Sequence, residues 1–265
     1  MRRTFVLIST CLIFAGVPLY AQANTAAEKD TGVKAPVYDV VSIKPSRPGG
    51  GVGQIMGLPD GFLIVNVSLS GVVYTAYHIK LDNQIKGLPG WTGSRYDIQA
   101  KESADTVEAL KKLSSEEQDK QQQRMLQSVL ADRCQLKVHW EMNEQPVYDL
   151  VIASGGLKMK AAANESPSSG YNDGHIVATA DSVVSLADYL SRFVGRIVVD
   201  KTGLADKKYD FTLDWASDLQ SEQADADAGP SIFTALQEQL GLKLIPAKGP
   251  VKILVIDHME RPSAN

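Results

Sequence analysis

Apolar residues recur at helical spacing in two stretches of the chain that resemble each other. The first stretch places Leu69, Val72, Val73, Ala76 and Tyr77 on one helix face, and the second does the same with Leu186, Tyr189, Leu190 and Phe193. Ser68 and Ser185 stand near their starts and are the predicted N-caps, because a serine hydroxyl accepts from the free N–H groups of a first helical turn.

Apolar and polar residues alternate along the chain after each of these predicted helices. The stretches "SRYDIQAK" and "KKYDFTLDW" both contain Tyr-Asp at the start of the alternation. In the first stretch Tyr96, Ile98 and Ala100 fall on one side of the chain, and in the second Tyr209, Phe211 and Leu213 do so. This period of two predicts half-buried strands. We expect each Tyr to pack in the scaffold rather than act in catalysis, and each Asp to begin the solvent side of its strand.

A second pair of helices ends each half. Their apolar stripes are Met125, Leu126, Val129 and Leu130, and then Ile232, Phe233, Leu236 and Leu240. Both run into Leu-Lys-apolar, and Gly241 is placed to cap the second helix at its C-terminus. Each half is then expected to close with a hairpin whose second arm opens at Pro-Val, at Pro146 and Pro250, because proline suits the first residue of a strand.

These landmarks occur in the same order in both halves, which indicates an internal duplication. The predicted fold is α+β, with two similar sub-domains that each have an antiparallel sheet and two helices on one face. The first repeat covers 37–159, a linker covers 160–174, and the second repeat covers 175–265. Residues 102–120 are polar and helix-prone, so they extend or precede the helix that follows, whereas the acidic residues 216–230 predict a solvated loop.

The first residues have the pattern of a secretory signal peptide. A short basic start precedes an apolar run, and the small-x-small motif that ends at Ala23 predicts cleavage there, with a flexible segment over 24–36. An uncleaved membrane anchor and a lipoprotein site at Cys11 are the alternatives. The signal predicts a secreted or periplasmic protein that has no stable membrane insertion once it is cleaved.

Composition limits the remaining function classes. The chain has 265 residues, of which 44% are hydrophobic and 22% charged, so it can bury a substantial core as one large or two small domains. The net charge is −4 and the lysines are scattered, which argues against a nucleic-acid partner. After cleavage Cys134 is the only cysteine, and its apolar neighbours favour a buried thiol over a reactive nucleophile.

Motifs for catalysis, cofactors or metals are not found in the sequence. The histidines at 78, 139, 175 and 258 have no metal-ligand spacing, and the sequence has no G-x-S-x-G elbow. The glycine-rich stretch that begins at Gly49 lacks the Lys-Ser/Thr of a phosphate loop, and Asp225 and Asp227 are too few ligands for a calcium loop. We therefore predict no metal, no cofactor and no identifiable catalytic residue.

Three short polar or aromatic stretches are the candidate ligand-binding sites. In "VVDKTGL", Asp200, Lys201 and Thr202 end an apolar strand, although the same residues also make a good polar turn. In "GLPGW", Trp91 either anchors a partner or caps the edge of the core. Asp257 and His258 follow the last apolar strand and complete the set of candidates.

Several ordered motifs, among them "QIKGLPGW", "MLQSVLADRCQLKVH", "PVYDLVIASGGLKMK" and "GPVKILVIDHMERPSAN", resemble the soil-associated DUF3738 family, which is abundant in Acidobacteria. The resemblance extends from about Tyr38 to Asn265. It implies an exported protein with no established activity and no catalytic residues to transfer. Some relatives are joined to membrane metallopeptidase regions of the antibiotic-sensor type, which suggests sensing or binding. This chain departs from the family pattern at Cys134, where Phe is frequent, and at "ADKK" before the second Tyr-Asp.

Two functions remain open from the sequence. The favoured one is a non-catalytic binding or interaction module outside the cytoplasm, which meets an unknown protein or small molecule in a groove between the halves or at a sheet edge. The alternative is an exported hydrolase that uses Asp200, Lys201, Asp257 and His258.

Overall fold

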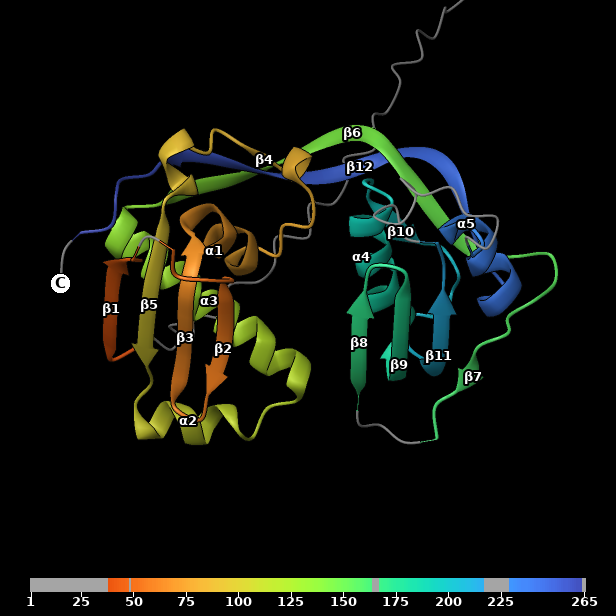
Figure 1. Ribbon diagram of the computed structural model, residues 1–265, viewed down its shortest axis with the longest axis horizontal. Coiled ribbons are helices and arrows are strands. Elements are labelled where there is room, and N and C mark those ends of the chain that lie inside the picture. The colour runs from red at the N-terminus through yellow and green to blue at the C-terminus, as the bar shows by residue number, and fades with distance from the viewer. Residues whose placement is uncertain (1–37, 48, 164–166, 217–228, 264–265) are drawn as a thin grey trace, which may run out of the picture. The chain divides into compact units, whose positions relative to one another are not determined.

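The computed structural model describes residues 38–47, 49–163, 167–216 and 229–263. The predicted signal peptide, the segment 24–36 and residues 217–228 of the predicted acidic loop lie outside this part. The α+β class is confirmed (Figure 1). The strands are β1 (Val40–Pro45), β2 (Gln54–Leu58), β3 (Gly61–Ser68), β4 (Ile85–Lys86), β5 (Arg95–Lys101), β6 (Lys137–Ile152), β7 (Lys160–Ala161), β8 (Ser168–Asn172), β9 (His175–Ser182), β10 (Val198–Asp200), β11 (Lys208–Asp214) and β12 (Leu242–His258). The helices are α1 (Leu69–Ala76), α2 (Ala104–Leu110), α3 (Ser115–Cys134), α4 (Val183–Phe193) and α5 (Ile232–Ala235), with short 3-10 turns η1 (Asp82–Gln84) and η2 (Gly90–Gly93) and a π-helical turn η4 (Leu236–Leu240).

The first lobe comprises β1, β2, β3, β5 and the helices α1 to α3. Its sheet has the order β1-β5-β3-β2, and all neighbours are antiparallel. The alternation predicted for β5 is confirmed, because Tyr96, Ile98 and Ala100 are buried in one cluster with the apolar faces of α1 and α3. Cys134 is buried in the same cluster, as predicted. Residues 102–120 form α2 and the start of α3, which confirms that this polar segment is helical.

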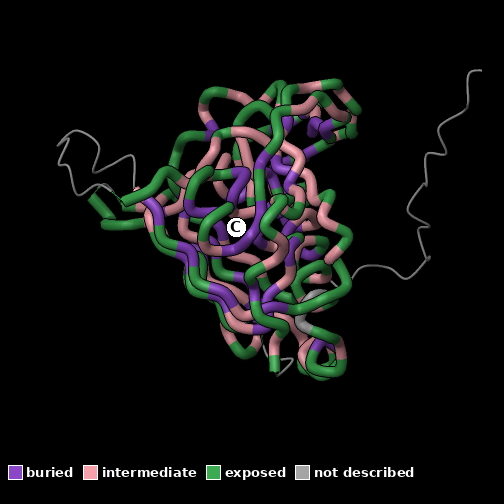
Figure 2. The backbone as a smooth tube through the Cα atoms, turned by 90° about the vertical axis from the view of Figure 1, so that its right-hand side faces the viewer, coloured by how far each residue is buried: buried purple, intermediate pink, exposed green. Residues whose placement is uncertain are grey.

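The second lobe comprises β7, β8, β9, β11, α4, α5 and η4. Its sheet order is β7-β11-β9-β8, again antiparallel, and the residues expected in the linker contribute β7 and β8 to it. Tyr209, Phe211 and Leu213 are buried beneath the helices, as the alternation predicts. Gly241 ends the last helical turn with φ 69°, which confirms the predicted cap. Figure 2 shows buried backbone segments running through the middle of the fold, with exposed segments around them.

A third sheet, of order β10-β6-β12-β4, corrects the expected hairpins. The chain does not turn before Pro146 or Pro250. Instead β6 and β12 are long continuous strands that pair antiparallel with each other from Lys137–His258 to Ile152–Leu242, side by side in Figure 1. The short strands β10 and β4 add to this pair in parallel, so the sheets are not purely antiparallel.

Proline is tolerated within these strands because the ribbon has open edges. The amide of Tyr148 donates to Ile197 on the outer side of β6 at 2.8 Å. The nitrogen of Pro146, two residues earlier, faces the same side, beyond the end of β10. A proline there removes no ladder hydrogen bond, so Pro-Val does not have to begin a strand.

The ribbon of β6 and β12 supplies residues to the cores of both lobes. Leu136, just before β6, and Leu254 and Ile256 of β12 pack in the first cluster, whereas Leu150 and Leu242 pack in the second. A small third cluster of Val147, Val251 and Ile253 lies between these stretches of the strands. Val138 of β6 is partly buried against the first cluster, so both strands contribute side chains to each lobe.

The repeated Tyr-Asp has a specific structural role. In the first lobe, β3 bulges at Asn66 (φ 53°), whose amide donates to Oδ1 of Asp97 at 2.8 Å. In the second lobe, β9 bulges at Ala180 (φ 51°), whose amide donates to Oδ1 of Asp210, also at 2.8 Å. Each Asp thus fixes a bulge in the neighbouring strand, rather than simply facing solvent as expected.

A serine caps the following helix two residues after each bulge. Ser68 accepts from the amide of Gly71 and caps α1, as predicted. The prediction of Ser185 as the second cap is wrong, because Ser182 is the N-cap of α4 and accepts from the amide of Ser185 at 3.0 Å. Helix α4 begins earlier than the apolar pattern indicated, since Val183 is itself buried. The matching bulge and cap support the idea of a duplication, which stays a prediction.

Candidate functional site

The residues predicted at the end of β10 form a local turn. Oδ1 of Asp200 accepts from the amide of Thr202 at 2.8 Å and from its hydroxyl at 2.7 Å, and Thr202 Oγ1 accepts from Leu204 N at 3.1 Å. The backbone of Lys201 donates to Leu150. The polar groups of Asp200 and Thr202 are thus engaged with each other and the backbone, which is the turn alternative.

Asp257 and His258 are adjacent in sequence but have different partners. Both carboxylate oxygens of Asp257 lie 2.9 Å from Nδ1 of His139 across the β6–β12 pair. Nε2 of His258 lies 3.0 Å from Glu260. The bond to Asp257 is the main cause that raises the pKa of His139. These are exposed surface pairs rather than a shared site.

The structure does not bring the predicted residues together. Asp200 is in register with Leu150 of β6, whereas His258 is in register with Lys137. The stretch of β6 between those partners corresponds to roughly 40 Å at about 3.3 Å per residue. A site that uses both Asp200 and His258 is therefore not formed.

Trp91 lies in η2 and packs against the first core cluster, half-buried. The guanidinium of Arg261 lies 5.1 Å from the centre of its ring. This is the geometry of a cation–π contact between the loop and the C-terminal segment. Trp91 thus covers the edge of the core in this structure.

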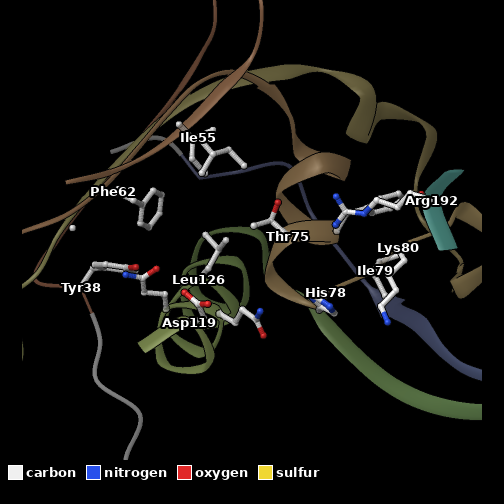
Figure 3. A pocket seen from close by; sticks show the side chains of 16 residues that line it. Tyr38, Ile55, Phe62, Thr75, His78, Ile79, Lys80, Asp119, Leu126 and Arg192 are labelled. Atoms are coloured by element: carbon white, nitrogen blue, oxygen red, sulfur yellow. The ribbon is translucent and has the colours of Figure 1, made fainter. Parts of the chain in front are cut away.

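A pocket of about 590 Å³, lined by the first lobe and by Arg192 of α4, is the best-formed candidate site (Figure 3). Its lining contains none of the residues predicted from sequence. Strands β2 and β3 supply an apolar side that includes Ile55, Phe62 and Ile64, and Leu126 of α3 lies opposite with Asp119, Gln122 and Gln123. The volume and the mixture of an apolar interior with a few polar groups are typical of small-molecule sites.

The far end of the pocket is formed by the turn that follows α1. Tyr77 caps the helix, His78 has φ 52°, and Ile79 donates its amide to the carbonyl of Tyr74 at 2.9 Å. This is a Schellman-type ending, in which glycine is the favoured residue at the position of His78. A histidine held in the left-handed region is uncommon, and such positions concentrate at functional sites.

The pocket's polar end is organised around Asp188 of α4. Its carboxylate accepts from Nε2 of His78 at 2.9 Å and forms an ion pair with Lys80. Burial by itself would raise the pKa of Asp188, but the bonds from His78 and Lys80 prevail and lower it. Asp188 is therefore held as a carboxylate whose charge is already shared between two donors.

Arg192 lies one helical turn beyond Asp188 and also lines the pocket. Its guanidinium is 6.0 Å from the centre of the Tyr189 ring. Among the described residues, no carboxylate forms an ion pair with Arg192, so its charge is available to a ligand. Figure 3 shows Arg192 and Asp119 on different sides of the pocket.

Sequence reasoning missed this pocket because its residues come from five separate elements, β2, β3, α1, α3 and α4, and from the segments beside them. His78 was one of the histidines considered, but only for metal spacing. The signal that could have drawn attention to it is its place directly after an apolar helical run, where a glycine is the usual ending.

The described residues contain no group of three or more His, Cys, Asp or Glu side chains that could hold a metal ion. None of the helices within the described ranges has the length and apolar character needed to span a bilayer.

A family model described as "Protein of unknown function (DUF3738)" matches residues 70–259. No curated protein and no solved structure matches the chain.

Proposed function

Because the chain belongs to the DUF3738 family, whose description assigns no function, we propose a function from the pocket itself: the protein binds a small amphipathic ligand there. This makes it a binding module rather than an enzyme. A sensory role, in which ligand occupancy is read by another protein, is consistent with this proposal.

The observation that supports this proposal is the composition of the pocket walls. Phe62 and Leu126 offer apolar surface from opposite sides, while His78, Lys80 and Arg192 gather at one end. A cavity with this division suits a molecule that has one apolar and one polar part. The left-handed His78 adds to the argument, because glycine there would relieve backbone strain but would remove the bond to Asp188.

A glycine in the pocket wall allows a direct test. Gly57 of β2 lines the pocket, and a Cβ added there would meet no atom within 4 Å. We expect Gly57→Leu to fill the space without disturbing the fold. The matched control is Gly170→Leu on β8, an edge strand of the second-lobe sheet, where an added Cβ also has open space.

Ligands would be sought by screening a library of amphipathic compounds for a rise in melting temperature. The proposal expects hits whose stabilising effect is lost in Gly57→Leu and kept in Gly170→Leu. Hits that bind both variants as tightly as wild type would place the ligand elsewhere. An empty screen, together with turnover in assays for hydrolase activity, would favour the hydrolase alternative, although its proposed residues are spread over separate surfaces.

We also propose that the protein works outside the cytoplasm after cleavage at Ala23. The support is the sequence pattern of the first residues. N-terminal sequencing of the protein recovered from its native host should begin at Asn24. Recovery of the intact N-terminus from the membrane fraction would instead support the uncleaved anchor.

A further inference from the structure

We propose that the ligand is a carboxylic acid with an apolar body, and that Arg192 binds its carboxylate. This inference rests on the proposed function, because it specifies the chemistry of the ligand in the same pocket. It follows from how the charges at the polar end are already distributed among the residues there.

The hydrogen-bond donors at this end differ in whether they already contact a carboxylate. His78 and Lys80 both contact Asp188, so their donors already face a carboxylate. Asp188 and Arg192 are spaced i, i+4 on α4, yet the carboxylate is directed to the first lobe and does not pair with Arg192. An arginine that has no anionic partner among the described residues and lies beside an apolar cavity is a suitable receptor for a ligand anion.

Arginine suits a carboxylate in particular. Its planar guanidinium can donate two parallel hydrogen bonds to the two carboxylate oxygens, which fixes both position and orientation. The Tyr189 ring, 6.0 Å from the guanidinium carbon, helps to hold the group in place. A neutral hydroxyl has one oxygen and no charge, so it could not accept both of these hydrogen bonds in the same geometry.

The rest of the pocket determines the orientation of the ligand. Tyr38 and Phe62 are in edge-to-face contact with ring centres 5.0 Å apart, and with Leu126 they form an apolar region away from Arg192. The carboxylate of Asp119 lies away from the Arg192 end of the pocket. It would therefore not repel a ligand carboxylate bound to Arg192. The apolar body would therefore rest on Phe62 and Leu126, with the acid group toward Arg192.

Octanoate and octan-1-ol are the probes, because they share a chain length and differ in charge. Binding would be followed by NMR titration of the full mature protein at neutral pH. We expect octanoate to bind more tightly than octan-1-ol, and Arg192→Gln to weaken octanoate about five- to tenfold while leaving octan-1-ol unchanged. The control is Arg196→Gln, which removes an arginine stacked on Tyr148 and outside the pocket lining.

The outcomes separate this inference from the function on which it rests. If both probes bind, Gly57→Leu blocks both, and Arg192→Gln changes neither, then the pocket is a binding site but the carboxylate assignment is wrong. If neither probe perturbs any pocket residue, the amphipathic pocket and the inference both fail. Selective loss of octanoate in Arg192→Gln, with Arg196→Gln like wild type, supports the inference.

Discussion

The bulge beside Tyr-Asp allows a sharp test of how the repeated motif stabilises the fold. In the second lobe, the amide of Ala180 is buried and donates to Oδ1 of Asp210 at 2.8 Å. Asp210→Ala leaves this amide without its acceptor. The cost of an unsatisfied buried donor is about 1–3 kcal/mol, so we expect the unfolding free energy to fall by about that amount.

Two further variants isolate the cause. Asp210→Asn keeps an acceptor oxygen in the same place, so we expect this variant to lose at most half of the unfolding free energy that Asp210→Ala loses. Asp214→Ala, on the same strand, removes a carboxylate that is 63% exposed and whose one ion pair among the described residues is with the exposed His175. A surface pair of this kind contributes about 0–1 kcal/mol.

Urea unfolding followed by circular dichroism measures the global change, and amide exchange at Ala180 measures the local one. The reasoning predicts faster exchange at that amide in Asp210→Ala than in Asp210→Asn. It is refuted if Asp210→Ala is as stable as Asp214→Ala, or if the Asn and Ala variants are equally destabilised.

The equivalent carboxylate in the first lobe adds a pH dependence. The Ser46 hydroxyl, followed by the Asn66 amide, lowers the pKa of Asp97 below its ordinary value of 3.8. A carboxyl group with a lowered folded-state pKa stabilises the fold fully above its unfolded-state pKa, and this contribution is lost as the pH falls through the folded-state pKa. We expect Asp97→Asn to flatten the acid limb of stability against pH, measured by urea unfolding between pH 7 and pH 3. An unchanged limb would contradict the assignment.

Three further predictions concern a thiol, a backbone position and a helix cap. Burial raises the pKa of Cys134 to about 11, so iodoacetamide should leave it unmodified in the folded protein at pH 8 and alkylate it in urea; rapid reaction of the folded protein would contradict this. Gly241→Ala should be poorly tolerated and Gly195→Ala much less destabilising in thermal melts, because both glycines have positive φ but only at Gly241 would the added Cβ clash with a backbone oxygen, that of Gly156. Ser182→Ala should cost about 1 kcal/mol in urea unfolding through loss of the α4 cap, whereas Ser182→Asp should restore most of it.

Local patterns in the sequence predicted the individual elements well. The alternation around Tyr96 and Tyr209 identified buried strand faces, and Gly241 identified a helix end, because both signals depend on neighbouring residues alone. The cap of α4 was misplaced because Ser182 and Ser185 are both serines near the start of the helix. The hydrogen bond from the Ser185 amide to the Ser182 hydroxyl, which only the structure shows, distinguishes them.

The long-range pairing could not be predicted in the same way. Pro146 and Pro250 each resemble the start of a strand, and nothing local reveals that they lie in two strands that pair with each other across the chain. The pocket was missed for a related reason. Phe62 and Arg192 have ordinary local surroundings, and only the fold brings them to one cavity with His78.

The order in which the chain is synthesised has a consequence for its folding. Leu254, Ile256 and Met259 are buried in the cluster that also holds Ile64 and Ile98, so the core of the first lobe is incomplete until these much later residues have been synthesised. Native assembly must wait for contacts between residues that are very distant in sequence, which slows folding. A chain that stays unfolded until β12 has left the ribosome could still pass through a translocation pore, as the proposed export requires.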